Sequence, residues 1–332
     1  MPPQTHHTPS PGTPPNASFT IGWICLQSLD TLPSREMLDQ TYGRNPTTPR
    51  PADKNAYNLG RIGRNNIVMA VLPADKPGRK PSMAMASQIA ADMKATFPNL
   101  KHGVLITTGS GIPSEHQDIR LGDVVVGTPD RNFKGVVRFQ KDVGFEGVKQ
   151  VKMGNTPYSG LLVNISNLLA ADRKLGKASK FHEFLLTLFQ HWYPERKEGH
   201  SYQGNSYDKL FDAGHGHVNS NDQHCVSCDP NKIIGREERK DSHPAVHLGT
   251  IASSDDPVAD PGVRRLLEMK FGAKAIQVGA AGLGDEFPTL IICGIKDYAD
   301  SHRNEHWDRY ASAAAAAYAR ELLLPLGPLH QE

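Results

Sequence analysis

The sequence predicts an α/β fold in which a central sheet is flanked by helices. Three segments are largely apolar and rich in β-branched residues but too short for helices, at residues 19–26, 102–108 and 288–295. Such runs are typical of strands that are buried on both faces of a parallel sheet. Open α/β sheets bind ligands at the carboxyl ends of their strands, so the polar residues that follow these runs are the candidate functional residues.

Composition limits the classes of function. The chain has 332 residues, 38% of them hydrophobic, which is enough to bury a sizeable core. The 37 basic residues nearly balance the 35 acidic ones, which argues against bulk attraction to nucleic acid or membrane surfaces. No apolar stretch reaches the roughly 18 residues of a membrane span, and no signal-peptide pattern begins the chain. We therefore expect a cytoplasmic protein with no nucleic-acid or membrane partner.

Local patterns predict the other elements. After the first strand, Thr31 or Ser34 is expected to cap a helix that runs through Leu38. Residues 41–55, rich in Pro, Asn and Arg, are expected to form a loop, and residues 57–62 and 66–72 a hairpin. From apolar spacing and an alanine-rich run near the end of the chain, we predict further strands at 136–140 and 244–254, and helices at 83–97, 159–175, 181–192, 264–270 and 307–324.

One domain is expected, at residues 19–325. Residues 1–18 contain six prolines and form a tail with too little apolar area to fold, and residues 326–332 form a second tail. Residues 193–242 are polar and lack a continuous apolar period, so they are expected to be an insertion. A long loop near a site is often a lid.

The cysteines are too few and too unevenly placed for a secreted disulfide framework, and Cys25 and Cys293 are expected to be core thiols. The remaining two lie in the insertion near a His-x-His pair. Together these two pairs offer enough ligands for a structural zinc site, namely His215, His217, Cys225 and Cys228. The pairs lie closer together than in the commoner zinc motifs, and a reduced dithiol beside solvated histidines explains the same pattern. We therefore predict no metal and keep zinc as the alternative.

The start of the helix at 83–97 is a candidate anion site. Pro81 and Ser82 are typical helix-entry residues, and the free N–H groups of a helix start attract anions. Arg79 and Lys80 add positive charge nearby. Phosphate or another anion would fit there, and a solvated basic loop is the alternative.

Two motifs resemble the nucleoside phosphorylase and nucleosidase superfamily, in particular its fungal subfamily. They are Arg-Leu-Gly-Asp-Val-Val-Val at 120–126 and Gly-Ile-Lys-Asp-Tyr-Ala-Asp-Ser-His at 294–302. The resemblance extends from about Phe19 to Leu324. It implies a three-layer fold with a central mixed sheet, a small-molecule substrate and a homo-oligomer. It implies no cofactor other than phosphate, which phosphorylases use as a co-substrate.

The same resemblance assigns a role to Asp297. An Asp at this position donates a proton to the purine as the glycosidic bond breaks, and a Met-Glu pair upstream holds the ribose. This chain has Val278 and Gly279 in place of that pair, directly after Gln277. The proton donor is thus present, whereas the carboxylate that binds the sugar hydroxyls is absent.

Further substrate contacts are implied at two other strand ends. The family has a glycine-rich turn after the strand at 102–108, where its backbone contacts phosphate and sugar, and a small polar segment that contacts the base. The residues at these places are Gly109, Ser110, Gly111, Ser253 and Ser254. Thr107 and Thr108 stand where smaller residues are usual, which predicts a narrowed pocket floor.

Asp30 is the second catalytic candidate. The nucleosidase branch has a Glu near this position that helps to activate the attacking water, and Asp30 is one methylene shorter. General-base catalysis requires hydrogen-bond distance before it requires a suitable pKa. The alternative is that Asp30 only begins a helix, where a carboxylate is favoured.

Three functions remain open from the sequence. The first is cleavage of the N-glycosidic bond of a nucleoside-like substrate with a changed sugar contact. The second is a different acid–base reaction on a non-nucleoside metabolite, for example in secondary metabolism. The third is a non-catalytic module that senses a ligand or binds a partner. Fold does not determine function, and the altered residues lie where the chemistry would occur.

Overall fold

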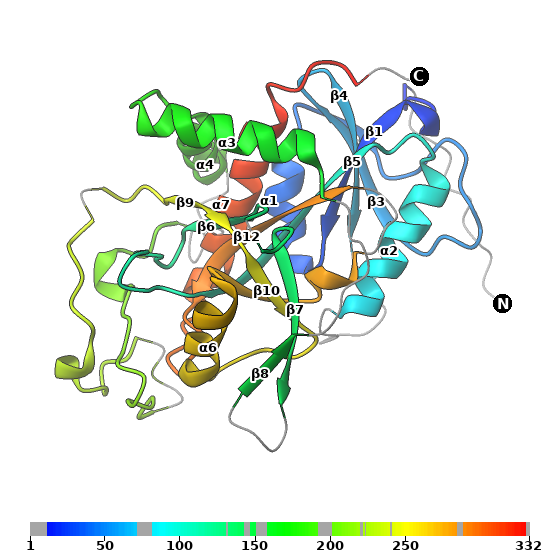
Figure 1. Ribbon diagram of the computed structural model, residues 1–332. Helices are drawn as coiled ribbons and strands as arrows, with labels where there is room; N and C mark the ends of the chain where they lie inside the picture. The colour runs from blue at the N-terminus through cyan, green and yellow to red at the C-terminus, as the bar shows by residue number, and fades with distance from the viewer. Residues whose placement is uncertain are drawn as a thin grey trace.

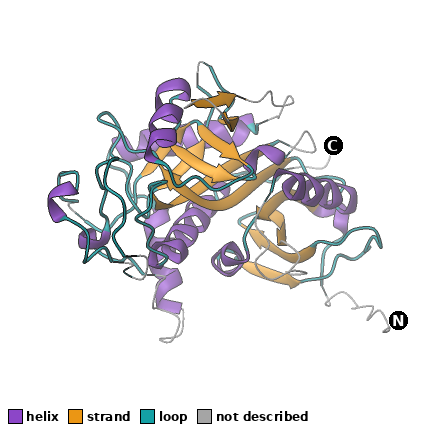
Figure 2. Ribbon diagram, turned by 90° about the horizontal axis from the view of Figure 1, so that it is seen from below, coloured by secondary structure: helices purple, strands orange, loops and turns teal. Residues whose placement is uncertain are grey.

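A computed structural model of the chain describes residues 12–71, 82–130, 132–142, 147–150, 158–191, 201–219, 222, 224–239, 241–283 and 288–329. These residues form a 12-stranded mixed sheet. Helices cover both sides of the sheet (Figures 1 and 2). The predicted three-layer α/β fold is confirmed.

The first part of the sheet has the strand order β2-β3-β4-β1-β5. β1 pairs in parallel with both β4 and β5, whereas β3 and β4 form the predicted antiparallel hairpin. β2 lies within the segment that was expected to be a loop. The bounds are β1 (Phe19–Cys25), β2 (Gln40–Gly43), β3 (Ala56–Ile62), β4 (Asn65–Val71) and β5 (His102–Gly111).

The second part of the sheet continues from the far end of β5. This end pairs antiparallel with β11, after which the order is β10, β7 and β8. Along most of its length, β5 also pairs in parallel with β12, which in turn pairs with β6, and β6 pairs with β9. The bounds are β6 (Val124–Gly127), β7 (Val136–Asp142), β8 (Gly147–Gln150), β9 (Val246–Gly249), β10 (Ile251–Ser254), β11 (Ala275–Val278) and β12 (Thr289–Asp297).

The single strand predicted at 244–254 is in fact two strands. β9 pairs with β6, whereas β10 pairs with β11 and β7. The chain changes partners at Gly249, whose φ of 156° carries it between the two strands. The side chain of Lys274 lies so close that a Cβ at Gly249 would be 2.5 Å from its Cε. β9 is half-buried and β10 is buried, and apolar periodicity does not reveal which strands lie beside each of them.

The predicted helices are present, with end residues that shift by a few positions. α7 contacts β12 and β5 of the sheet and packs against the helices α1, α3 and α4. α2 lies elsewhere, against β1 and the turn after β11 (Figure 1). α1 begins at Thr31, so its N-cap residue is Asp30, whose side chain makes no capping hydrogen bond. The predicted cap at Thr31 or Ser34 is therefore wrong. The bounds are α1 (Thr31–Glu36), α2 (Met83–Thr96), α3 (Gly160–Lys174), α4 (Lys180–His191), α6 (Pro261–Phe271) and α7 (His306–Leu323). Within the described part of the chain, every helix is too short or too polar to cross a bilayer.

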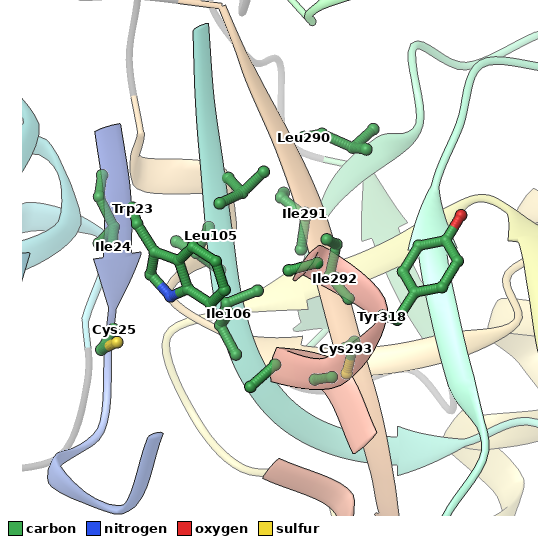
Figure 3. Close-up of a cluster of buried hydrophobic side chains, with 14 of the residues drawn as sticks. Trp23, Ile24, Cys25, Leu105, Ile106, Leu290, Ile291, Ile292, Cys293 and Tyr318 are labelled. Carbon is green, nitrogen blue, oxygen red and sulfur yellow. The ribbon is translucent and has the colours of Figure 1, made fainter. Parts of the chain in front are cut away.

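The main apolar core contains buried side chains of the sheet, of α7 and of α2. The largest buried side chains of β1, β5 and β12 meet there, including Trp23, Leu105 and Ile292 (Figure 3). Cys25 and Cys293 are fully buried among them, as expected for core thiols. Burial raises the pKa of both thiols well above the usual value.

Both predicted tails are in part docked to this body. Asn16 is buried, and its amide donates hydrogen bonds to the carbonyls of Thr48 at 2.8 Å and Thr96 at 3.0 Å. Near the other end, the amide of Asn65 donates to the carbonyl of Leu326 at 3.3 Å. Residues 1–11 and 330–332 of the two tails lie outside the described part of the chain.

The close approach of α7 to β12 gives a first prediction. A Cβ at Gly294 would lie 1.9 Å from the carbonyl oxygen of Ala311 on α7. Gly294→Ala therefore forces helix and strand apart, and we expect it to lower the free energy of unfolding by about 3 kcal/mol or more.

Urea unfolding measures this effect. Gly160→Ala is the control, because Gly160 begins α3 and a Cβ there meets no atom within 4 Å. The control should unfold at the urea concentration of the parent chain or slightly above it. Equal midpoints for the two variants would contradict the packing argument.

Candidate functional site

Asp297 ends β12 at the edge of the sheet where the predicted site residues converge. Its side chain is buried, and its Oδ1 accepts a hydrogen bond from the Ala299 N–H at 2.9 Å. Arg303 Nε lies 3.7 Å from Oδ2. In the strand register Asp297 is opposite Ser110 of β5, and Ser110 is in turn opposite Ile276 of β11. The structure therefore brings the candidate acid next to two other predicted segments.

Ser253 and Gln277 organise the turn that follows β11. Ser253 Oγ accepts from the Ala281 N–H at 3.0 Å, and Gln277 Oε1 accepts from the Ala280 N–H at 2.7 Å. Gln277 Nε2 also donates to Thr107 Oγ1 at 3.2 Å. Both side chains are buried. Their polar atoms bond to the protein itself, so they set the position of the turn η5 (Ala280–Gly282).

Gly109, Ser110 and Gly111 belong to β5, so the predicted glycine-rich turn is wrong. A Cβ at Gly109 would lie 2.3 Å from the carbonyl oxygen of Ile276, and one at Gly111 would lie 2.8 Å from Ile295 Cγ2. These glycines allow β5 to pass closely between β11 and β12. Their small size is thus explained by strand packing.

Gly279 has a backbone that favours glycine. Its φ is +90°, and a Cβ there would lie 3.2 Å from both the carbonyl carbon and the oxygen of Ser82. The start of α2 packs even more closely on η5, where a Cβ at Gly282 would be 2.0 Å from the Met83 oxygen. A side chain at position 279 would therefore require a strained left-handed backbone and a shift of a few tenths of an ångström at Ser82. The preceding Val278 is half-buried.

The predicted anion site at the start of α2 already has acceptors from the chain. Asp255 Oδ1 accepts from the Met83 N–H at 3.2 Å, and Ser82 Oγ accepts from the Met85 N–H at 3.3 Å. Arg79 and Lys80 lie outside the described residues. Two of the N–H groups that would bind an anion are thus engaged by protein oxygens.

Asp30 is fully buried beneath α7. Its Oδ1 accepts from Ser312 Oγ at 2.7 Å, and Oδ2 has no hydrogen-bond partner among the described residues. Burial raises the pKa of Asp30 to about 7, an effect that the Ser312 hydrogen bond partly offsets. This carboxyl group is therefore enclosed by the protein, away from any water that it was predicted to activate.

A pocket of about 540 Å³ opens beside Ser254. It lies between the carboxyl end of β10, β7 and the start of α6, and Ser254 Oγ donates to the Asp256 carbonyl at 2.6 Å at its edge. Its charged lining residues are Arg138, Lys141, Asp255, Asp256 and Asp260. Arg138, Lys141, Asp256 and Asp260 were not predicted. The Asp255-Asp256 pair at a strand end and Asp260 before Pro261 at a helix start are signals that would have suggested them.

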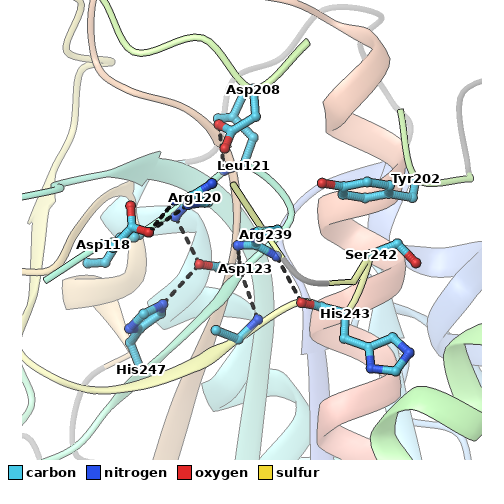
Figure 4. Close-up of polar contacts among 12 residues, drawn as sticks. Asp118, Arg120, Leu121, Asp123, Tyr202, Asp208, Arg239, Ser242, His243 and His247 are labelled. Carbon is cyan, nitrogen blue, oxygen red and sulfur yellow. Dashed lines mark hydrogen bonds and ion pairs between the residues drawn. The ribbon is translucent and has the colours of Figure 1, made fainter. Parts of the chain in front are cut away.

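The Arg-Leu-Gly-Asp motif anchors the insertion. Asp123 is fully buried and accepts hydrogen bonds from Arg239, from His247 Nε2 at 2.9 Å and from the Arg120 N–H at 2.8 Å (Figure 4). Burial alone would raise the pKa of Asp123, but His247 and Arg239 hold it below the usual value. Arg120 in turn donates to the Glu237 carbonyl. The motif thus has a structural role in this chain.

A second anchor lies next to Asp297. The hydroxyl of Tyr298 is buried, donates to Asp208 of the insertion and accepts from Arg236 Nη1 at 3.0 Å. Arg236 Nη2 also lies 3.0 Å from the Asp208 carboxylate. The insertion is therefore bonded to the residue that follows the candidate acid.

Solved structures with a similar fold are nucleosidases. A mutant of the Helicobacter pylori MTAN, with 5′-methylthioadenosine in its active site, has a TM-score of 0.56 at 14% identity over 93% of this chain and 99% of that chain. The futalosine hydrolase of the same organism has a TM-score of 0.54 at 14% identity over 93% and 99%. The Neisseria meningitidis 5′-methylthioadenosine/S-adenosylhomocysteine nucleosidase, in complex with methylthio-immucillin-A, has a TM-score of 0.54 at 16% identity over 92% and 99%. This chain has the nucleosidase fold.

One relative is similar in sequence. It is a nucleotide-binding leucine-rich repeat-like protein of the fungus Hyaloscypha variabilis, 33% identical over 319 residues. The match includes 93% of this chain but spans only 30% of that protein. No family model matches the chain.

The backbone at Gly279 gives a second prediction. Gly279→Ala should destabilise the protein by more than the roughly 1–2 kcal/mol of a left-handed alanine, because its Cβ also presses on Ser82. Gly176→Ala is the matched control, since Gly176 has a φ of +72° but no atom within 4 Å of its Cβ position. The free energy of unfolding of both variants, measured with a chemical denaturant, separates the cost of backbone strain from the cost of the contact with Ser82. Equal losses would show that α2 does not restrict position 279.

The buried carboxyl group of Asp30 gives a prediction of pH dependence. Its pKa is about 7 in the folded protein against 3.8 ordinarily. Between about pH 4 and 7 the unfolded chain has lost this proton and the folded chain retains it, so the group lowers stability as pH rises. Asp30→Asn keeps the acceptor for Ser312 and removes this penalty, which is on the order of 4 kcal/mol at most.

Thermal unfolding from pH 5 to 8 tests this sign. The Tm of Asp30→Asn minus that of the parent chain should increase as pH rises through this range and level off above about pH 7. A difference that is constant with pH, or that falls, would contradict the raised pKa.

Proposed function

We propose that the chain cleaves the N-glycosidic bond of a nucleoside-like substrate, with Asp297 as the acid toward the leaving base. The observation that supports this most is the place of Asp297, a buried carboxyl group at the end of β12 in a nucleosidase fold. In this reaction the bond between the base nitrogen and the sugar carbon breaks, and the base accepts the proton of Asp297. Water or phosphate then adds to the sugar carbon.

The substrate would lie along the strand ends beside Asp297. Ser110 is next to Asp297 in the register, and Gln277 and Ser253 hold the turn after β11. Ser254 faces the pocket of about 540 Å³. In this proposal backbone groups of these segments, rather than their engaged side chains, contact the substrate. Asp30 takes no part, because its carboxyl group is enclosed beneath α7.

The sugar contact is the altered part of the site. A carboxylate that accepts both ribose hydroxyls would contribute charge-assisted hydrogen bonds of about 1.5–3 kcal/mol each. Gly279 offers none, and its positive φ and its close contact with Ser82 disfavour a side chain there. Ordinary ribonucleosides should therefore react slower by several powers of ten than a substrate whose sugar is held by other groups.

A second candidate is a module that binds such a ligand without turnover. The similar fungal protein is a nucleotide-binding leucine-rich repeat-like protein, of which this chain spans 30%. In a chain of that kind, the absence of the sugar carboxylate would reduce cleavage, and the ligand would be held by other contacts. Ligand-dependent stabilisation without release of base would distinguish this candidate from the enzyme.

The catalytic proposal predicts the effect of Asp297→Asn. Asparagine keeps the shape of the side chain but cannot donate the proton, so release of free base should fall by about 10²–10⁴-fold. Chromatography of a nucleoside panel, with and without phosphate, measures the release and separates hydrolysis from phosphorolysis. Asp172→Asn is the control, since Asp172 lies on the surface of α3 and bonds to Lys177. Unchanged turnover in Asp297→Asn would exclude its role as the acid.

A further inference from the structure

Three histidines and two cysteines gather where the insertion meets the end of the sheet. We call this set the His–Cys cluster; its members are His215, His217, Cys225, Cys228 and His302. They form two groups that share Cys228, and within each group the ligand atoms lie within 4.8 Å of one another. Four members come from the insertion, and His302 comes from the segment after β12.

The spacing of the ligand atoms fits a tetrahedral ion. His217 Nδ1 lies 3.2 Å from Cys228 Sγ and 3.7 Å from Cys225 Sγ. With zinc–sulfur bonds of about 2.3 Å and zinc–nitrogen bonds of about 2.0–2.1 Å, tetrahedral ligands are separated by about 3.3–3.8 Å. Three of the four positions of a zinc site are therefore close to their required geometry.

His302 is the best candidate for the fourth ligand, although His215 Nε2 is also buried without a hydrogen-bond partner among the described residues. Its side chain is only 2% exposed, and neither ring nitrogen has a hydrogen-bond partner among the described residues. A buried imidazole without partners is costly unless something binds it. Asp300 Oδ1 lies 3.7 Å from Nδ1, which resembles the carboxylate–histidine pairing around bound zinc and leaves Nε2 for the metal.

We propose that the cluster binds one zinc ion through four ligands: Cys225, Cys228, His217 and His302. The ion replaces the thiol protons and leaves no position open to water, so its role is structural. His215 stacks beside His302, with ring centroids 5.6 Å apart, and remains outside the first set of ligands.

The insertion has little apolar core of its own, so a bound ion would stabilise its fold. Its described part contains two short 3-10 helices and an isolated bridge between Phe211 and Ile233, and its own apolar cluster has three buried members, two of which are the cysteines. So small a core supplies little stability, and small units of this kind commonly depend on a metal or on disulfides. The ring of Phe211 already stacks on His302 at 3.9 Å.

The ion would also help to fix the position of the insertion relative to the candidate site. It would join the insertion to His302, which lies in the same segment as Asp297 and Tyr298. Tyr298 already bonds to Asp208 of the insertion. Two separate attachments on this one segment would hold the insertion at the carboxyl end of β12. The zinc proposal does not depend on catalysis, since it concerns residues other than the candidate acid.

Metal analysis of the full chain tests the proposal. Protein purified without chelator should contain about one zinc per chain, and addition of a chelator should lower its Tm. Cobalt added to the metal-free protein should produce the absorption bands of a tetrahedral thiolate site. Cys225→Ser, Cys228→Ser, His217→Ala and His302→Ala should each lose most of the bound zinc.

Matched controls distinguish ligands from neighbours. His224→Ala removes an exposed histidine that stacks on His306 in the same region, and it should retain zinc, as should His215→Ala. If His302→Ala retained zinc and His215→Ala lost it, the proposal that zinc joins the insertion to the segment after β12 would be overturned. A metal-free chain with no cobalt spectrum, or one with a Cys225–Cys228 disulfide, would overturn the zinc site even if the ligand variants fail to fold.

Discussion

The close packing around β5 is the constraint on which the site depends. This one strand pairs with β1 and β12 along its length and with β11 at its end. This arrangement requires glycine at positions 109 and 111. A Cβ at position 109 would clash with Ile276, and one at position 111 would clash with Ile295. The ends of β11 and β12 are thereby held on either side of Ser110, which places Asp297 and the turn at Gly279 at one edge of the sheet.

The polar groups at this edge differ in what they can do. Ser253 and Gln277 use their side chains to hold η5, and Asp255 occupies the start of α2. The second oxygen of Asp297 lies 3.7 Å from Arg303 Nε. In the proposed reaction this carboxyl group is the proton donor, and the neighbouring residues shape the backbone around it. Gly279 is favoured at its position by a positive φ and by the approach of α2, which is a feature of packing rather than of charge.

The insertion is attached to this edge through buried charges. Asp123 binds Arg239 and His247, and Tyr298 binds Asp208 and Arg236. Buried ion pairs of this kind cost much when one partner is removed, because the other remains desolvated. The Arg-Leu-Gly-Asp motif, which by sequence indicates a family, acts here as an attachment point. The His–Cys cluster lies on the same side, after β12, so the site and the insertion depend on the same segment.

Much of the fold was determined by local sequence. Apolar runs in β1 and β12, the β3–β4 hairpin and the alanine-rich α7 follow from periodicity and turn chemistry, and the place of Asp297 at a strand end follows with them. Tertiary structure alone decided the change of partner at Gly249, the inclusion of Gly109–Gly111 in β5 and the enclosure of Asp30 by Ser312. It also decided that His302 joins the cysteines of the insertion. These features arise from contacts between residues far apart in the chain, and no local pattern of hydrophobicity or charge contains that information.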